Sequence, residues 1–405
     1  MVLNVVVVQE RVSKKLDELV GDVKETGKMF DVLLNEFNST DSLEEVNSVI
    51  LSDSTVFGRF PEVVLVRENV KKVKVPIDVS PSLYGTDTVL DALKGFSVVG
   101  VDTSEILPSA HMFPSFLLVN VGVQGIRYGS SLHVEDSVPF IYTSADLKRE
   151  ARKGGYRITS TWSVESKRWK CQFNILRDIC SKFSDLVFVL FDESFSLGYL
   201  GARSVDERKA VVESFVEVMK CFRDLRVVPI GVFYTRSSAL CASLIRGLFC
   251  KDKSCCKDCV AEARSKGELD KLPCEEMLMK DSTLIDRFVD FGWRSMVFQV
   301  LNRVTREHDL EIYGFYLKVG GGNVLRVEFP SWALRWVEQI GIVVLGQACL
   351  GGGYPYVLER AHEQAYISYS ERNWVYEYVS KLLREKYGLD LKISRKELRK
   401  RRGIV

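Results

Sequence analysis

The middle of the chain alternates fully apolar runs with segments of helical spacing. Apolar residues recur every three or four positions in two segments, which predicts helices over 164–183 and 205–224. Short, fully apolar runs predict buried strands over 186–191 and 227–234, and 97–102 is predicted as a buried strand that ends in Asp102. Further strands are predicted over 116–121, 125–131 and 139–143.

This order of elements favours an α/β fold with a ribonuclease H-like mixed sheet flanked by helices. Antiparallel strands come first and parallel crossovers follow. In such a fold the first and fourth strands are parallel neighbours, so Asp102 and Asp192 are expected side by side at the carboxyl ends of these strands. Ligand sites of open α/β sheets lie at that edge.

The flanking segments are less regular. We expect a long or broken helix over 9–38, strands within 55–75, a loop and short helix over 77–93, a helix over 282–302, a hairpin of 312–319 with 324–329, and helices over 331–341 and 356–386. The corresponding division is 1–95 (N-terminal helix and strands), 96–245 (ribonuclease H-like core), 246–281 (Cys-rich insertion), 282–390 (C-terminal part that completes the site) and 391–405 (basic tail).

The segment 9–38 carries apolar residues on more than one face, so we expect a homodimer contact or a partner there, the alternative being packing within its own domain. The tail, 392–402, is expected to be a solvated arm or to contact DNA phosphates.

Composition narrows the class of protein. The chain has 405 residues and a net charge of +2, which excludes a globally basic nucleic-acid coat. No run approaches about 18 uninterrupted apolar residues, and the apolar N-terminus lacks a basic region before it. We therefore expect a cytoplasmic protein with no membrane contact.

Asp102 and Asp192 suggest a divalent metal site, because adjacent buried carboxylates are costly unless a cation neutralises them. Each could instead cap the turn after its strand. Glu165 lies on the buried face of the helix before Asp192 and is the candidate third acid; it could equally be a helix N-terminal acid. Carboxylates together with the imidazole of His362 would suit Mn²⁺ better than Mg²⁺. His362 could instead have a structural role.

Five of the ten cysteines fall between Cys250 and Cys274. Cys256 and Cys259 have chelating spacing, and Cys250 and Cys274 could complete a structural Zn²⁺ site. A disulfide or free thiols remain the alternatives.

Several motifs together resemble the NurA nucleases of archaea: Val101-Asp102-Thr103-Ser104, Phe191-Asp192-Glu193-Ser194, residues 234–238, 326–330 and 353–363. The last is the most specific, since Tyr354-Pro355 is followed by Ala361-His362-Glu363. The resemblance implies a Mn²⁺-dependent nuclease of double-strand break repair that resects DNA ends 5′ to 3′ and cuts single strands. It also implies a homodimer seated on a HerA-type hexameric ATPase.

Carried over by residue, the resemblance implies that Asp102 and Asp192 are metal ligands, completed by Tyr354 and His362. Glu165 is assigned to the family's helix glutamate. Arg236 could neutralise a DNA phosphate by a bidentate contact, the alternative being an ordinary surface charge. Thr103 and Glu193 depart from the usual glycines after the two aspartates.

Two other functions compete with this one. An actin-like or sugar-kinase ATPase would share the strand order, with 320–322 as its adenosine motif, but Glu193 stands where a phosphate loop needs glycine. A nuclease-like, non-catalytic scaffold for the translocase would follow if the set of acids is incomplete.

Overall fold

The computed structural model describes residues 62–79, 86–108, 112–143, 161–234, 281–320 and 323–393, with short stretches at 8–9, 11–16, 31, 34–35, 38–39, 47, 146, 262 and 265–267. Most of the predicted helix over 9–38, Arg236, the four candidate zinc cysteines and the tail beyond 393 lie outside these residues.

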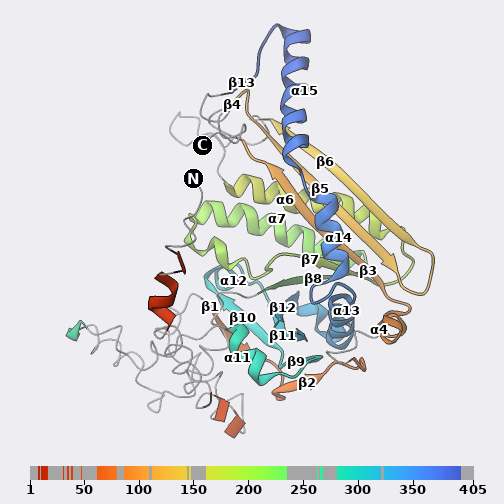
Figure 1. Ribbon diagram of the computed structural model, residues 1–405, viewed down its shortest axis with the longest axis vertical. Helices are drawn as coiled ribbons and strands as arrows, with labels where there is room; N and C mark the ends of the chain where they lie inside the picture. The colour runs from red at the N-terminus through yellow and green to blue at the C-terminus, as the bar shows by residue number, and fades with distance from the viewer. Residues whose placement is uncertain are drawn as a thin grey trace.

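Within the described residues, one mixed sheet of eleven strands forms the centre of the molecule (Figure 1). Its main order is β1-β10-β11-β12-β8-β7-β3-β5-β6. Outside this order, β9 pairs with β11, and β2 pairs with β9. The strands are β1 (Glu62–Val66), β2 (Lys72–Lys74), β3 (Ser97–Ile106), β5 (Phe116–Arg127), β6 (His133–Thr143), β7 (Val187–Phe191), β8 (Val227–Tyr234), β9 (Trp293–Ser295), β10 (Phe298–Asn302), β11 (Ile312–Gly320) and β12 (Asn323–Pro330).

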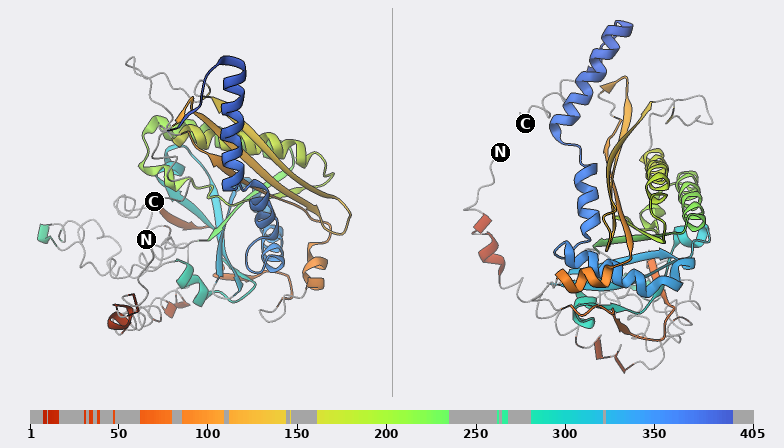
Figure 2. Two further views of the ribbon diagram at one scale, coloured as in Figure 1. Left: turned by 45° about the horizontal axis from the view of Figure 1, so that its top comes forward. Right: turned by 90° about the vertical axis from the view of Figure 1, so that its right-hand side faces the viewer.

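Helices cover both faces of this sheet. Seen edge-on, α6 and α7 lie on one face and α13 and α14 on the other, while α15 projects beyond them (Figure 2). The helices are α4 (Thr86–Leu93), α6 (Thr161–Cys180), α7 (Val205–Asp224), α11 (Asp281–Phe288), α12 (Arg303–Glu307), α13 (Val337–Leu350), α14 (Tyr356–Ala365) and α15 (Tyr369–Tyr387), with 3₁₀ turns η1 (Gly198–Ala202) and η3 (Ser331–Trp336). A small pair, β4 (Met112–Phe113) with β13 (Lys392–Ile393), lies beside α15.

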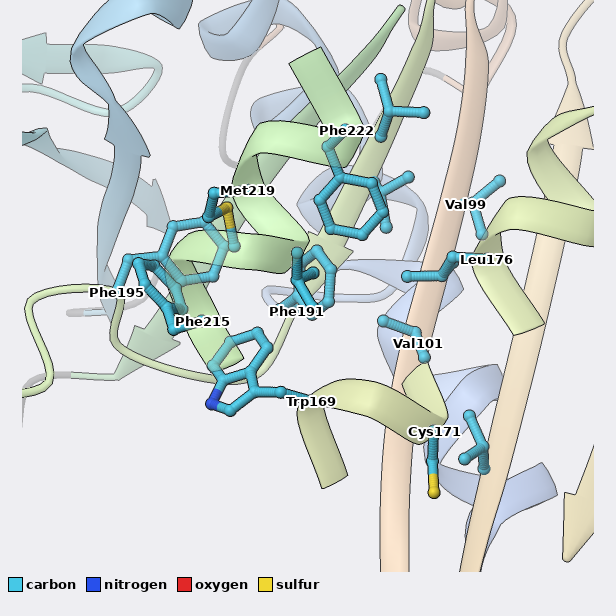
Figure 3. Close-up of a cluster of buried hydrophobic side chains, with 14 of the residues drawn as sticks. Val99, Val101, Trp169, Cys171, Leu176, Phe191, Phe195, Phe215, Met219 and Phe222 are labelled. Atoms are coloured by element: carbon cyan, nitrogen blue, oxygen red, sulfur yellow. The ribbon is translucent and has the colours of Figure 1, made fainter. Parts of the chain in front are cut away.

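Alternate residues of the central strands fill two separate cores. Val99 and Val101 of β3 point toward α6 and α7, and Val98 points toward α13 and α14. Trp169 of α6 sits in the first core against the rings of Phe191 and Phe215 (Figure 3). Burial of each such side chain contributes roughly 1.5–3 kcal/mol to the free energy of unfolding, so the central strands are anchored on both faces.

The segment Ser331–Leu350, which combines η3 and α13, is long and apolar enough to span a membrane, and 56% of it is buried in the protein. The apolar residues of α13 pack in the second core against the sheet.

The central elements agree closely with the sequence pattern. The predicted helix over 205–224 and the strand over 227–234 have the observed bounds, and β3 pairs with β7 in parallel as expected. The hairpin of β11 and β12 also forms. Its strands are neighbours in the sheet and pair up to Gly320 and Asn323, as expected for a hairpin.

Several predicted elements differ in extent from the structure. The strand at 97–102 continues to Ile106, because pairing with β5 extends it past Asp102. The segments 116–121 and 125–131 form the single strand β5, whose glycines admit close packing rather than a turn. The predicted helix over 331–341 is η3 followed by α13, which runs on to Leu350.

The predicted helix over 282–302 ends at Phe288, and the chain then forms β9 and β10. Gly292 has a φ of 74°, a conformation that breaks the helix. The predicted helix over 356–386 is two helices, because Ser368 and Glu371 form a capping box that starts α15.

Candidate active site

Asp102 and Asp192 stand at the point where β7 ends. The parallel register pairs Val101 with Phe191, so the next residue of each strand is an aspartate. Burial raises the pKa of the Asp192 carboxyl, and the charge of Asp102 raises it further. The two carboxylates therefore repel one another, although Asp192 keeps an exposed surface.

Helix α14 brings His362 to the same point. Two glycines, Gly100 and Gly122, lack the side chains that would meet its backbone: an added Cβ would lie 2.2 Å from the carbonyl oxygens of Val357 and Ala361, respectively. Because α14 approaches so closely, His362 Nδ1 lies 2.7 Å from Asp102 Oδ2. The imidazole itself is 69% exposed.

Tyr354 closes the site from the turn before α14. Its hydroxyl faces the Asp192 carboxylate closely enough to lower that carboxyl's pKa, but the two do not form a hydrogen bond of normal geometry. Its ring stacks on Tyr234 with centroids 5.3 Å apart. Burial, and then the charge of Asp192, raises the pKa of Tyr354, so the phenol stays protonated.

The opposite face of β3 carries a second set of charges that the sequence patterns did not identify. Arg168 of α6 forms ion pairs with Glu105 (2.9 Å) and Glu193 (2.5 Å), and its Nε donates to Thr103 Oγ1 at 2.9 Å. Burial raises the pKa of Glu105 although the charge of Arg168 opposes this. The signal for this cluster was the period-2 alternation of β3, which places Thr103 and Glu105 together on the α6 face.

The partly buried Glu165 lies on α6 close to Arg168. Glu165 faces Arg168 and Tyr199 one turn earlier on α6, and burial raises its pKa. Its role as a metal ligand remains a prediction.

Glu328 of β12 fixes the loop that follows Asp192. Its side chain is fully buried, and Oε2 accepts hydrogen bonds from Ser194 Oγ (3.0 Å), Phe195 N (2.7 Å) and Ser196 N (3.0 Å). The neighbouring Arg326 forms an ion pair with it. Only the resemblance pointed to this segment, and it did not assign Glu328 a role.

The donor chemistry at the strand ends fits a divalent cation. Asp102 and Asp192 are adjacent carboxylates, and His362 can reach the same space. No three carboxylate, imidazole or thiol groups in the described part of the chain are already arranged around one point. Mg²⁺-like ions are commonly held by one or two carboxylates, with waters and substrate phosphates completing the shell, so two aspartates are sufficient donors.

Comparison with known proteins identifies the family. The sequence profile of the NurA domain matches residues 96–367, and no curated protein matches. Two of the similar solved structures are the NurA nuclease from Sulfolobus solfataricus (13% identity, TM-score 0.46, covering 93% of this chain and 97% of that one) and NurA bound to dAMP and manganese (11% identity, TM-score 0.38, covering 94% and 98%).

The matched region covers more than half of the chain. It contains Asp102, Asp192, Tyr354 and His362, the four residues that the fold brings to one edge of the sheet. The chain belongs to the NurA family.

Proposed function

We propose that this protein is a metal-dependent nuclease that hydrolyses DNA phosphodiesters. The observation that carries the proposal is the meeting of Asp102, Asp192, Tyr354 and His362, from distant parts of a NurA-family chain, at one edge of the sheet. The sheet, with three antiparallel strands followed by parallel β7 and β8, supports the ribonuclease H-like assignment. Mn²⁺ is the proposed ion, since a NurA structure was obtained with manganese, and Mg²⁺ is an alternative.

Each residue has a specific role in this proposal. Asp102 and Asp192 would hold the ion, which when bound makes water more acidic and stabilises charge on phosphate oxygens. Asp102 accepts the Nδ1 proton of His362, which leaves Nε2 of the neutral ring free to take a proton from the attacking water. Tyr354 keeps its proton and is placed to donate a hydrogen bond to a phosphate oxygen near Asp192.

The finer assignments rest on the family resemblance. They are 5′-to-3′ exonuclease and single-strand endonuclease activity in double-strand break repair, homodimerisation and a HerA-type hexameric ATPase partner. Three further proposals rest on the sequence alone: a cytoplasmic location, a DNA phosphate contact by Arg236, and a structural zinc on Cys250, Cys256, Cys259 and Cys274.

A non-catalytic scaffold is the second candidate function. It is favoured by one observation: α6 presents Arg168, rather than a carboxylate, to the strand ends.

Cleavage of end-labelled single-stranded and duplex DNA with Mn²⁺ or Mg²⁺ separates the two functions. Asp102→Asn and Asp192→Asn are expected to abolish cleavage while the fold is retained, because each keeps the shape of the side chain and removes the charge. Asp178→Asn is the matched control, since this exposed acid lies on α6 away from the site. Full activity in either active-site variant, or no cleavage by the wild type with either ion, would exclude the nuclease assignment.

A further inference from the structure

Arg168 occupies the place where α6 reaches the ends of the central strands. Its guanidinium is held by three groups: Glu105 at 2.9 Å, Glu193 at 2.5 Å and Thr103 Oγ1 at 2.9 Å. Gln172, one turn later on α6, donates from Nε2 to the same Glu193 oxygen at 3.2 Å. The side chain of Arg168 is only 26% exposed, so it is a fixed part of the site.

The strand pleat separates this cluster from the two aspartates. Gly100 and Asp102 point to the face covered by α14, where an added Cβ on Gly100 would meet the α14 backbone. Val101, Thr103 and Glu105 point to the opposite face, covered by α6. The sheet edge therefore carries carboxylates on both faces, one pair near His362 and one pair around Arg168.

The two pairs differ in how their charge is compensated. Glu105 and Glu193 each have the guanidinium within ion-pair distance. Asp102 and Asp192 have no Arg or Lys partner within the described residues, and Asp102 contacts only the imidazole of His362 and the amide of Thr103. A divalent ion at Glu105 and Glu193 would have to displace Arg168 or lie beside its positive charge, whereas one at the aspartates meets no such charge.

We propose that Arg168 is the built-in cation of the α6 side of this site, so that the chain binds one divalent ion, at Asp102 and Asp192, instead of a closely spaced pair. This rests on the proposed metal-dependent function and specifies its metal content. Arg168 acts by keeping Glu105 and Glu193 paired, and is in that sense a positioning residue. It supplies one fixed positive charge where a second ion would supply two.

Electron paramagnetic resonance of the full chain titrated with Mn²⁺ alone tests the proposal. Two Mn²⁺ ions in a two-metal site lie about 3.5–4 Å apart, and such a pair gives a spin-coupled spectrum that ions at remote sites do not produce. We expect the wild type at saturation to give only the six-line spectrum of isolated ions, lost from the site in Asp192→Asn. Arg168→Met, which frees Glu105 and Glu193, should bind a second Mn²⁺ ion per chain, counted from the loss of free-ion signal, and Arg168→Lys should not.

A coupled spectrum in the wild type would overturn the proposal and leave the metal-dependent function intact. A single bound Mn²⁺ ion per chain in a folded Arg168→Met variant would also overturn it, because removal of the cation would then have opened no site. If Arg168→Met does not fold, the wild-type spectrum still decides between one ion and two. No Mn²⁺ binding that depends on Asp102 and Asp192 would instead refute the proposed function itself.

Discussion

The closeness of α14 to the sheet predicts that Gly122→Ala will separate His362 from Asp102. An added Cβ would lie 2.2 Å from Ala361 O and 2.3 Å from Ala365 N, whereas real Cβ atoms stay at least 3.0 Å from such atoms. The atoms in conflict are backbone, so a rotamer change cannot relieve them. Helix α14 must therefore move away from β5 by roughly 1 Å, which matches the misplacement that reduces catalysis about 100-fold in other enzymes.

The size of this effect follows from the contact that the helix carries. His362 Nδ1 and Asp102 Oδ2 are 2.7 Å apart. A shift of α14 by roughly 1 Å would lengthen this distance beyond the usual hydrogen-bond limit of about 3.2 Å. Overpacking of this kind also lowers the free energy of unfolding by about 1–3 kcal/mol. We expect Gly122→Ala to remain folded by circular dichroism, to unfold at lower urea concentration, and to cleave end-labelled DNA about 100-fold more slowly.

Two further glycines test the geometry. Gly100→Ala meets the backbone of Val357 at 2.2 Å and should behave like Gly122→Ala, while Gly201→Ala in η1 has no atom within 4 Å of the added Cβ and should behave like wild type. A folded Gly122→Ala protein that cleaves DNA at the wild-type rate would refute the reasoning, because the close approach of α14 would then not position His362.

Three other changes have defined outcomes. Tyr354→Phe removes a hydroxyl without a hydrogen-bond partner, so thermal unfolding should occur at the same or higher temperature while cleavage slows; a lower unfolding temperature would contradict this. Burial tends to raise the pKa of Glu68, but Arg294 holds it below 4.5, so this pair stabilises the fold above that pH and the contribution disappears as the pH falls through the lowered pKa. The stability gap between wild type and Glu68→Gln in urea should accordingly close in acid, and a gap unchanged from pH 7 to pH 3 would count against it. Glu328→Gln removes the carboxylate charge that is paired with the buried Arg326 and should lower the free energy of unfolding by about 3–5 kcal/mol; a loss under about 1 kcal/mol would show that the ion pair matters little.

The sequence predicted the centre of the fold because its elements are buried on defined faces. Both faces of β7 are covered, so the strand is a continuous apolar run that resembles no amphipathic helix of its length. The predicted buried face of α6 is likewise confirmed by Trp169, Leu176 and Cys180, and Asp178 points to solvent as expected. Such signals are local, and tertiary contacts reinforce them.

Elements that depend on distant partners were harder to predict. The segment that forms β10 was predicted as part of a helix, although Phe298 and Val300 have the period-2 spacing of a strand. They are buried because β10 pairs with β1 and β11, more than 230 and about 15 residues away in the chain. The break before α15 had a local signal, since Ser368 and Glu371 have capping-box spacing. Apolar residues continue on both sides of Ser368, so the hydrophobic pattern alone predicts one continuous helix.

The site shows the same division between local and distant information. The spacing of apolar runs was enough to place Asp102 and Asp192 side by side, although β3 continues past Asp102 and only β7 ends there. The contact of Asp102 with His362 joins residues 260 positions apart and depends on two glycines whose importance appears only when α14 is packed on the sheet. The resemblance to a family supplied His362, but it could not supply the reason for its position.

The charges on α6 depend on partners that come from the strands. The helical wheel correctly predicts a buried face that includes Gln172, and Glu165 as the metal-binding acid of that face stays a prediction. The structure places Arg168 between Glu105 of β3 and Glu193, which follows β7. The positive charge of Arg168 lowers the repulsion between these two carboxylates, whereas a further carboxylate on the helix would increase it unless a metal ion were bound. The alternation of β3 places Glu105, three residues after Asp102, on the opposite face of the strand. Arg168 of α6 is its positive partner there.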